Sequence, residues 1–211
     1  MKNIFRLFFF ISVLALFSSC SNASSKSSEA LFQSGDIIFQ TSQSAQCEAV
    51  RLATHSKYSH CAILFVENGE VMVYEAVQPV KITPFEKWIK HGKGNSYVVR
   101  RLKNASTVLT PEILSKMKTY SEQDMGKSYD IYFGWSDDKI YCSELVWKTY
   151  KEGADLEVGK LQKLKEFDLI SGPVKEKLEE RYGKNIPLEE TVISPQSIFE
   201  SDLLVTIEDT Y

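Results

Sequence analysis

The strongest local constraint on folding in this sequence is a dipeptide, Asn68-Gly69, that lies between two runs rich in β-branched, aromatic and other apolar residues. The runs cover residues 58–66 and 70–77. Asn-Gly between such runs favours a two-residue hairpin turn, because both turn positions need a positive φ. The sequence therefore predicts an antiparallel hairpin in which Glu67 pairs with Glu70.

This pairing decides which side chains share a face of the hairpin. Side chains alternate between the two faces along a strand, so His60 and Glu75 lie on one face as diagonal neighbours. Cys61 points to the other face. The remaining residues of both faces are largely apolar, and we expect both faces to be buried.

The His60–Glu75 pair has two interpretations. Buried polar groups need partners, so the two side chains could simply satisfy each other within the core. Alternatively, the carboxylate orients the imidazole and leaves its second nitrogen free to take a proton from a thiol. The hairpin alone supports both interpretations, and the choice depends on whether a suitable thiol lies nearby.

Cys142 is the candidate thiol. Residues 140–147 run from an extended lead-in into an apolar helical pattern, and Cys142 sits at the junction. The unpaired N–H groups and the dipole of a helix N-terminus stabilise a thiolate there. A small buried residue at a helix start is the alternative interpretation. Cys61 faces away from His60 and is predicted to be a bystander, and Cys47 falls inside a helical pattern and is predicted to be core.

The other elements alternate between helices and strands. We expect helices over residues 42–54, from Pro84 onward, from Pro111 to about Met125 and from Cys142 to near Gly153, with Thr83 and Thr110 capping the second and third. Strands are expected over residues 35–40, 96–102 and 199–207. Residues 159–182 are expected to form helical stretches that are broken at Gly172-Pro173. This mixed order favours an α+β fold with a small antiparallel sheet packed with helices. A length of 211 residues suits one such domain.

The N-terminal segment is predicted to direct export. Lys2 and Arg6 precede an apolar run too short to span a bilayer comfortably, and Ser18 and Ser19 lead into Cys20. This resembles a bacterial lipoprotein signal in which Cys20 is lipidated, with plain secretion as the alternative. We therefore expect a signal over residues 1–20, a flexible Ser-rich tether over 21–30 and the folded domain over 31–211. The resemblance implies a membrane-anchored lipoprotein of the cell envelope.

Charge and composition exclude several function classes. The net charge is −3 with no long basic run, so we expect no nucleic-acid partner. The three histidines, His55, His60 and His91, show no zinc-ligand spacing, and no glycine-rich phosphate loop is present. No metal and no cofactor are therefore expected. If Cys20 carries lipid, three cysteines remain, and an odd number leaves at least one free thiol.

Five short motifs, in this order, resemble the permuted papain-like amidases of the YaeF/YiiX type: Gly35–Phe39, Tyr58–Ile63, Tyr74–Ala76, Tyr129-Asp130 and Tyr141–Val146. These amidases belong to the wider NlpC-type superfamily, to which lecithin:retinol acyltransferase-like proteins are related. The resemblance implies a circularly permuted papain-like fold, in which the histidine precedes the cysteine.

The resemblance also implies roles for individual residues. Cys142 corresponds to the nucleophile, His60 to the general base and acid, and Glu75 to the orienting group, in agreement with the hairpin argument. Asp36 and Tyr129 match family positions near the active site and are expected to contact substrate.

Three functions follow from these expectations. The first is a cysteine hydrolase that cleaves a peptide or amino-acid amide through a thioacyl-enzyme, with cell-wall peptides as one candidate substrate. The second is a lipid-directed acyltransferase or thioesterase that uses the same triad. The third is a non-catalytic envelope lipoprotein that binds peptide or cell-wall fragments.

Overall fold

The computed structural model describes residues 31–211, and the expected signal, Cys20 and the tether lie outside the described residues. The lipid anchor and the envelope location therefore stay predictions. Among residues 31–211, no helix is both long and apolar enough to cross a membrane.

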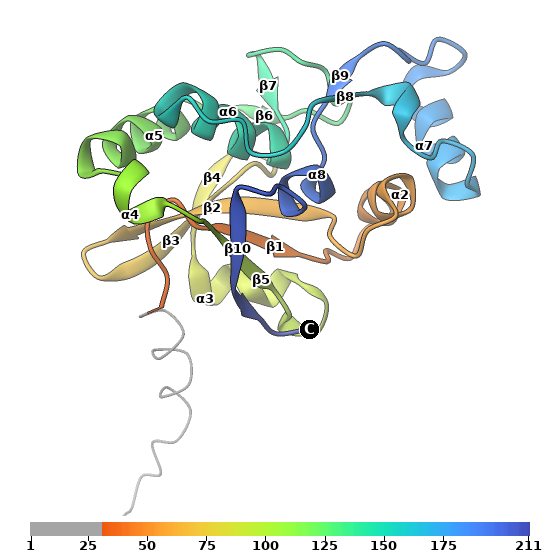
Figure 1. Ribbon diagram of the computed structural model, residues 1–211. Coiled ribbons are helices and arrows are strands. Elements are labelled where there is room, and N and C mark those ends of the chain that lie inside the picture. The colour runs from red at the N-terminus through yellow and green to blue at the C-terminus, as the bar shows by residue number, and fades with distance from the viewer. Residues whose placement is uncertain (1–30) are drawn as a thin grey trace, which may run out of the picture.

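A six-stranded sheet, in which every pairing is antiparallel, forms the centre of the fold (Figure 1). Its strand order is β10-β5-β1-β2-β3-β4. The strands are β1 Ile37–Gln40, β2 His60–Glu67, β3 Glu70–Glu75, β4 Lys81–Pro84, β5 Val98–Leu102 and β10 Leu204–Asp209. Because β10 pairs with β5, the last strand of the chain closes one edge of the sheet.

The predicted hairpin is confirmed as strands β2 and β3. Glu67 pairs with Glu70, and Asn68 and Gly69 have φ values of 51° and 84°. Alternate residues of β2 enter two separate apolar clusters, so both faces are buried as expected. Cys61 belongs to the cluster that packs under helix α6 (Cys142–Ala154), and Ala62 belongs to the cluster on the opposite side.

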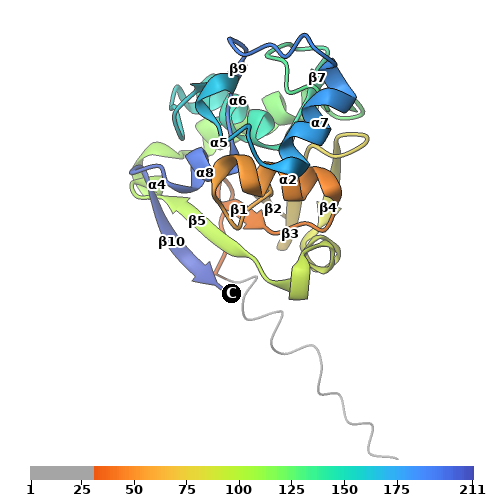
Figure 2. The ribbon, with the colours of Figure 1, turned by 90° about the vertical axis from the view of Figure 1, so that its right-hand side faces the viewer.

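Helices cover both faces of the sheet unequally (Figures 1 and 2). The helices are α2 Ala45–Thr54, α3 Phe85–Trp88, α4 Ala105–Val108, α5 Pro111–Gln123, α6 Cys142–Ala154, α7 Gly172–Tyr182 and α8 Pro195–Phe199, with 3-10 turns η1 Ile89–His91, η2 Lys93–Asn95 and η3 Leu164–Glu166. The longer helices α5 and α6 pack against each other, and α6 also packs on β2. Helix α2 lies beside α7, at the end of the sheet where β2 begins.

Two pairs of very short strands support the loops around α6. Strand β6 Ser128–Tyr129 runs parallel to β7 Lys139–Ile140, directly before Cys142. Strand β8 Gln162–Lys163 pairs with β9 Thr191–Val192. The first pair brings Tyr129 next to the start of α6.

Helix α6 is buried along most of its length, which fixes the position of its N-terminus. All nine residues from Cys142 to Tyr150 are buried. Its polar residues are paired: Glu144 lies 2.8 Å from Lys148 Nζ and accepts a 3.3 Å hydrogen bond from the Tyr141 N–H. The prediction that this helix begins at Cys142 is confirmed.

Several local expectations were wrong. Thr83 does not cap a helix but lies in β4, a strand that the sequence analysis missed, and α3 begins one residue after Pro84 without a side-chain cap. Thr83 instead donates a hydrogen bond to Glu75. Gly172-Pro173 begins α7 and does not break a helix, since proline suits the first turn.

Helix α5 is capped by Thr110 as expected and ends at Gln123, close to the predicted end near Met125. One further boundary and one burial prediction were wrong. Phe199 ends α8, and the last strand begins only at Leu204. Cys47 is half-buried, because α2 lies at the periphery and buries only Ala49 completely.

The close approach of α5 and α6 depends on a glycine. A Cβ at Gly153 would lie 2.4 Å from Met117 Cγ and 2.6 Å from Met117 Cα. We expect Gly153→Ala to lower the free energy of unfolding by about 1–3 kcal/mol, because overpacking forces backbone shifts. Urea denaturation measures this.

Gly172→Ala is the matched control, because no atom outside its neighbours in the chain and its own helix backbone lies within 4 Å of a Cβ at Gly172. We expect this variant to unfold at nearly the parent urea concentration. Equal midpoints for Gly153→Ala and the parent would contradict the helix contact described here.

Candidate active site

The His60–Glu75 contact is confirmed, and it is buried. His60 Nε2 lies 3.0 Å from Glu75 Oε2, and the two residues are 7% and 1% exposed. Two further groups hold the carboxylate: the Thr83 hydroxyl donates to Oε1 at 2.6 Å, and the Trp88 indole N–H donates to Oε2 at 2.9 Å. The Trp88 ring also stacks beside the imidazole at 5.8 Å.

These contacts decide the charge states of the pair. Burial raises the pKa of Glu75, but the hydrogen bonds and charge of His60, with a further bond from Thr83, outweigh it and lower the pKa overall. Burial likewise lowers the pKa of His60, but hydrogen bonds and charge from Cys142 and Glu75 raise it to about 10. Both directions favour a carboxylate on Glu75 and an imidazolium on His60.

Cys142 lies at the first position of α6 and is 4% exposed. A hydrogen bond from the Cys61 thiol is the largest influence on its pKa; burial opposes it, and His60 adds a hydrogen bond and a positive charge. Together these contacts hold the pKa of Cys142 well below its usual value. This direction favours a Cys142 thiolate beside a protonated His60.

The position of Cys61 corrects the sequence analysis. As expected, the Cys61 side chain points to the face of the sheet opposite the one that carries Glu75. Helix α6, however, packs on the face that carries Cys61. Cys61 is among the groups that lower the pKa of Cys142, so it is not a bystander. His60 is the first residue of β2, and its hydrogen bond and charge lower the pKa of the same thiol.

Tyr129 and Asp36, the two residues expected to contact substrate, lie in different places. The Tyr129 hydroxyl is 3.9 Å from Cys142 Sγ, and burial together with Cys142 raises the pKa of this phenol well above its usual value. Asp36, by contrast, accepts hydrogen bonds at 2.7 Å from both Arg101 Nε and Nη2, and one at 2.8 Å from the Gln33 N–H. Both carboxylate oxygens of Asp36 are engaged in these contacts. The expected substrate contact of Asp36 is therefore replaced by a structural ion pair with Arg101.

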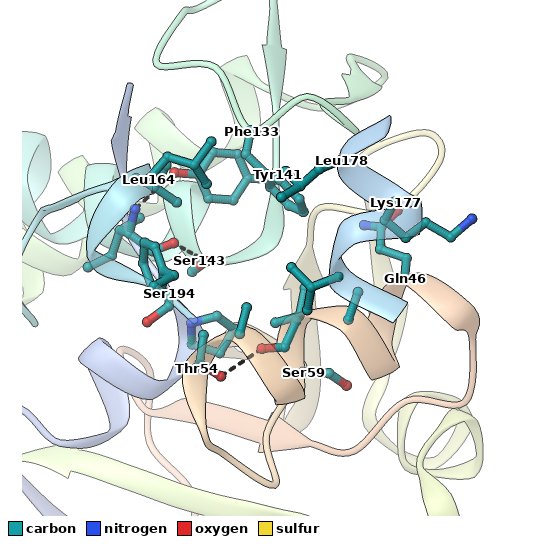
Figure 3. Close-up of a pocket in the computed structure, with 18 of the residues that line it drawn as sticks. Gln46, Thr54, Ser59, Phe133, Tyr141, Ser143, Leu164, Lys177, Leu178 and Ser194 are labelled. Atoms are coloured by element: carbon teal, nitrogen blue, oxygen red, sulfur yellow. Dashed lines mark hydrogen bonds between the residues drawn. The ribbon is translucent and has the colours of Figure 1, made fainter. Parts of the chain in front are cut away.

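An apolar pocket opens beside Cys142 and encloses about 100 Å³. Figure 3 shows it between α2 and α7, with Leu164 and Leu178 on one side, Thr54 and Ser59 on the other, and Lys177 pointing away. Most of its lining is aliphatic or aromatic, including Ala49, Val50, Ala53, Phe133, Leu164, Phe167, Leu169, Val174, Leu178, Val192 and Ile193.

A second cavity, here called the histidine-side groove, opens on the other side of Tyr129. His60 and Glu75 line it, and its hydrogen-bonding side chains also include Gln40, Ser42, Ser44, Gln78, His91, Ser128 and Lys139. It has a volume of about 740 Å³. The groove and the apolar pocket share Gln46, Val50, Ser59 and Tyr129, so Tyr129 marks the boundary between an apolar and a more polar half-site.

Sequence reasoning missed Thr83 and Trp88 as partners of Glu75. The alternation of Lys81, Ile82 and Thr83 is a weak strand signal that would have placed Thr83 across from the hairpin, where it pairs with Val73. No local pattern signals the contact of Trp88, because it depends on how α3 folds back under the sheet.

Sheet, helix and site together define a papain-like cysteine hydrolase in which the histidine precedes the cysteine. The family model described as permuted papain-like amidase enzyme, YaeF/YiiX, C92 family matches residues 31–208, and the chain belongs to this family. The predicted family, the permuted papain-like α+β fold and the class of enzyme, a cysteine amidase or peptidase-like hydrolase, are confirmed.

Two relatives from Escherichia coli resemble the chain over most of its length. The uncharacterized protein YiiX of strain K12 is 52% identical over 175 residues, which cover 83% of this chain and 85% of the relative. A crystal structure described as metalloprotein yiiX from O157:H7 has 51% sequence identity and a TM-score of 0.81, and the match covers 85% of this chain and 98% of that one.

The description of that relative raises the question of a metal in this chain. Within the described part of the chain, no group of three or more His, Cys, Asp or Glu side chains is arranged to hold a metal ion. The side chains around Cys142 do not fit a metal centre.

The charge state of Cys142 makes its reactivity testable. We expect iodoacetamide to modify Cys142 at neutral and mildly acidic pH, because its lowered pKa keeps the sulfur ionised there. Cys61 should resist modification, since burial and Cys142 raise its pKa well above the usual value. Peptide mapping after brief labelling across a pH series measures both.

In the same series, His60→Ala serves as the control. Loss of the imidazolium should raise the pKa of Cys142 and move its labelling profile to higher pH. A profile that is identical in the parent and in His60→Ala would contradict the ion pair.

Proposed function

We propose that this protein hydrolyses an amide bond through a thioacyl-enzyme, with Cys142 as nucleophile, His60 as general acid and base, and Glu75 as the orienting group. The observation that carries the proposal is the buried contact of His60 Nε2 with Glu75 at 3.0 Å, and it is supported by the effect of Cys142, which raises the pKa of His60. Thr83 and Trp88 in turn hold Glu75 and so restrict the orientation of the imidazole.

In the first step, the Cys142 thiolate attacks the amide carbonyl, and the carbonyl oxygen becomes an oxyanion. Two kinds of donor lie close to Cys142: the N–H groups of the first turn of α6, which lack intrahelical partners, and the Tyr129 hydroxyl. His60 then gives its proton to the leaving amine, the C–N bond breaks, and the thioacyl-enzyme remains. His60 next takes a proton from water, which attacks the thioester and restores the Cys142 thiolate.

This chemistry assigns a direction to the substrate. The leaving amine must lie beside His60, which protonates it, and His60 lines the histidine-side groove. The acyl group stays on Cys142, which lines the apolar pocket. We therefore propose an amide with an apolar acyl side and a more polar amine side.

The apolar pocket also favours a second candidate function, a lipid-directed acyltransferase or thioesterase with the same three residues. The thioacyl-enzyme is common to both reactions, and only the group that accepts the acyl chain differs. The substrates that form this intermediate, and the acceptors that release it, distinguish the two candidates.

The first test combines a nucleophile variant with a substrate series. Cys142→Ala should lower kcat by a factor on the order of 10⁶, or to the detection limit, since the nucleophile is removed. Circular dichroism should show an unchanged fold. Amides and thioesters with acyl groups of increasing length, assayed with and without an alcohol or amine acceptor, define the reaction by their products.

Release of free acid in water, with kcat/KM rising as the acyl group fills the apolar pocket, is the expected result for the parent. Transfer to the acceptor without hydrolysis would favour the acyltransferase. Full activity of Cys142→Ala would exclude the proposed nucleophile.

Tyr129→Phe tests the side-chain donor separately. We expect kcat to fall by about 10²–10³-fold with a smaller change in KM, because the hydroxyl stabilises charge that develops only in the transition state. Steady-state kinetics on the best amide substrate measure the effect. A change confined to KM would mean that Tyr129 only contacts bound substrate.

A further inference from the structure

Gln46, a residue of α2 that the proposed mechanism does not use, lies in hydrogen-bond contact with the Tyr129 hydroxyl. Its side-chain Nε2 is 3.3 Å from that oxygen, and the same hydroxyl is 3.9 Å from Cys142 Sγ. On its other side, Gln46 Oε1 accepts a 2.8 Å hydrogen bond from Nη2 of Arg181, a residue of α7. Arg181, Gln46 and Tyr129 therefore form a hydrogen-bond relay that connects α7, through α2, to the nucleophile.

The donors and acceptors of these groups give the relay one direction. A guanidinium can only donate, so the Gln46 atom that faces Arg181 must be the carboxamide oxygen. The Gln46 NH₂ group then faces Tyr129 and donates to its oxygen. A phenol has a single hydrogen, and because its oxygen accepts from Gln46, this hydrogen is free to point to Cys142.

Other contacts hold both ends of the relay. The Arg181 guanidinium lies over the Phe133 ring, 5.3 Å from its centre, and the Tyr129 backbone N–H donates a 2.7 Å hydrogen bond to Gln78 Oε1. Burial and the neighbouring Cys142 raise the pKa of the Tyr129 hydroxyl well above its usual value, so this group keeps its proton. The relay thus ends in a neutral donor beside the sulfur.

We propose that Gln46 and Arg181 are positioning residues of this enzyme: Arg181 fixes the orientation of the Gln46 carboxamide, and Gln46 directs the Tyr129 O–H to the group that reacts at Cys142. The direction of the O–H rests on the relay alone, and only its effect on turnover rests on the proposed function. Gln46 lines both the apolar pocket and the histidine-side groove, so substrate binding is the alternative role that the test must separate.

Gln46→Glu is the decisive variant, because it keeps the size of the side chain and reverses its hydrogen bonding. A carboxylate can pair with Arg181 but can only accept, so it would draw the Tyr129 proton away from Cys142. We expect kcat on the best amide substrate to fall by about 10–100-fold with KM nearly unchanged, a smaller loss than in Tyr129→Phe, because the donor is turned and not removed. Gln43→Glu is the matched control, since Gln43 is exposed and lines neither cavity, and it should keep parent kinetics.

A double-mutant cycle separates positioning from a structural effect or from the added charge. In the Tyr129→Phe background, Gln46→Glu should change kcat by less than about twofold, since no hydroxyl remains to be turned. Arg181→Met, which frees the carboxamide to rotate, should lower kcat in the parent and have no further effect in Tyr129→Phe. Gln46→Leu replaces Gln46→Glu in the cycle if circular dichroism shows that the glutamate variant does not fold.

A second measurement needs no substrate. Donation from the Tyr129 hydroxyl stabilises a Cys142 thiolate, so Gln46→Glu should move the iodoacetamide labelling of Cys142 to higher pH in the parent, and much less in Tyr129→Phe.

Unchanged kcat in Gln46→Glu, a change confined to KM, or equal effects of Gln46→Glu with and without the Tyr129 hydroxyl would overturn the proposal. The expected labelling shifts in a protein that hydrolyses no tested amide would leave the relay standing and would count against the proposed function alone.

Discussion

The buried carboxylate of Glu75 is the constraint on which the rest of the site depends. An isolated charge at this depth would cost many kcal/mol, so the fold must supply partners for it. It receives hydrogen bonds from His60, Thr83 and Trp88, which come from β2, β4 and α3. One side chain on β3 therefore ties three neighbouring elements together. Because the same contacts orient the imidazole, stability and proton transfer have a common structural basis.

The Cys142 sulfur approaches the hydrogen-bonded residues around Glu75 from the opposite side of the sheet. Helix α6 packs on the face that carries Cys61, while Glu75 and Trp88 belong to the other side. His60 connects the two sides because it is the first residue of its strand. The site thus lies at the beginning of strand β2, where the N-terminus of α6 and the short strand β6, which carries Tyr129, converge. This convergence also creates two differently lined cavities on either side of the sulfur.

Most features that depend on neighbouring residues were predicted correctly, whereas several contacts between distant elements were not. The hairpin register, the Thr110 cap and the start of α6 are local, and residues a few positions apart determine them. Thr83 was misassigned because a hydroxyl suits several local roles, and the expected role of Asp36 came from the family resemblance. Their actual partners, Glu75 and Arg101, belong to other elements. The face to which Cys61 points was predicted correctly, but its role as a bystander was not. The alternation of side chains along a strand does not show which helix covers each face.

The sequence by itself determined the pairing of His60 with Glu75, because Asn68-Gly69 leaves one register for the hairpin and the period of a strand is two. It also determined the helix that starts at Cys142. Only the tertiary structure decided that Cys61 lies under α6, that Trp88 and Thr83 hold the carboxylate, and that α2 and α7 enclose an apolar pocket. These contacts join segments far apart in the chain, and their formation depends on how helices pack on a sheet, which no local pattern specifies.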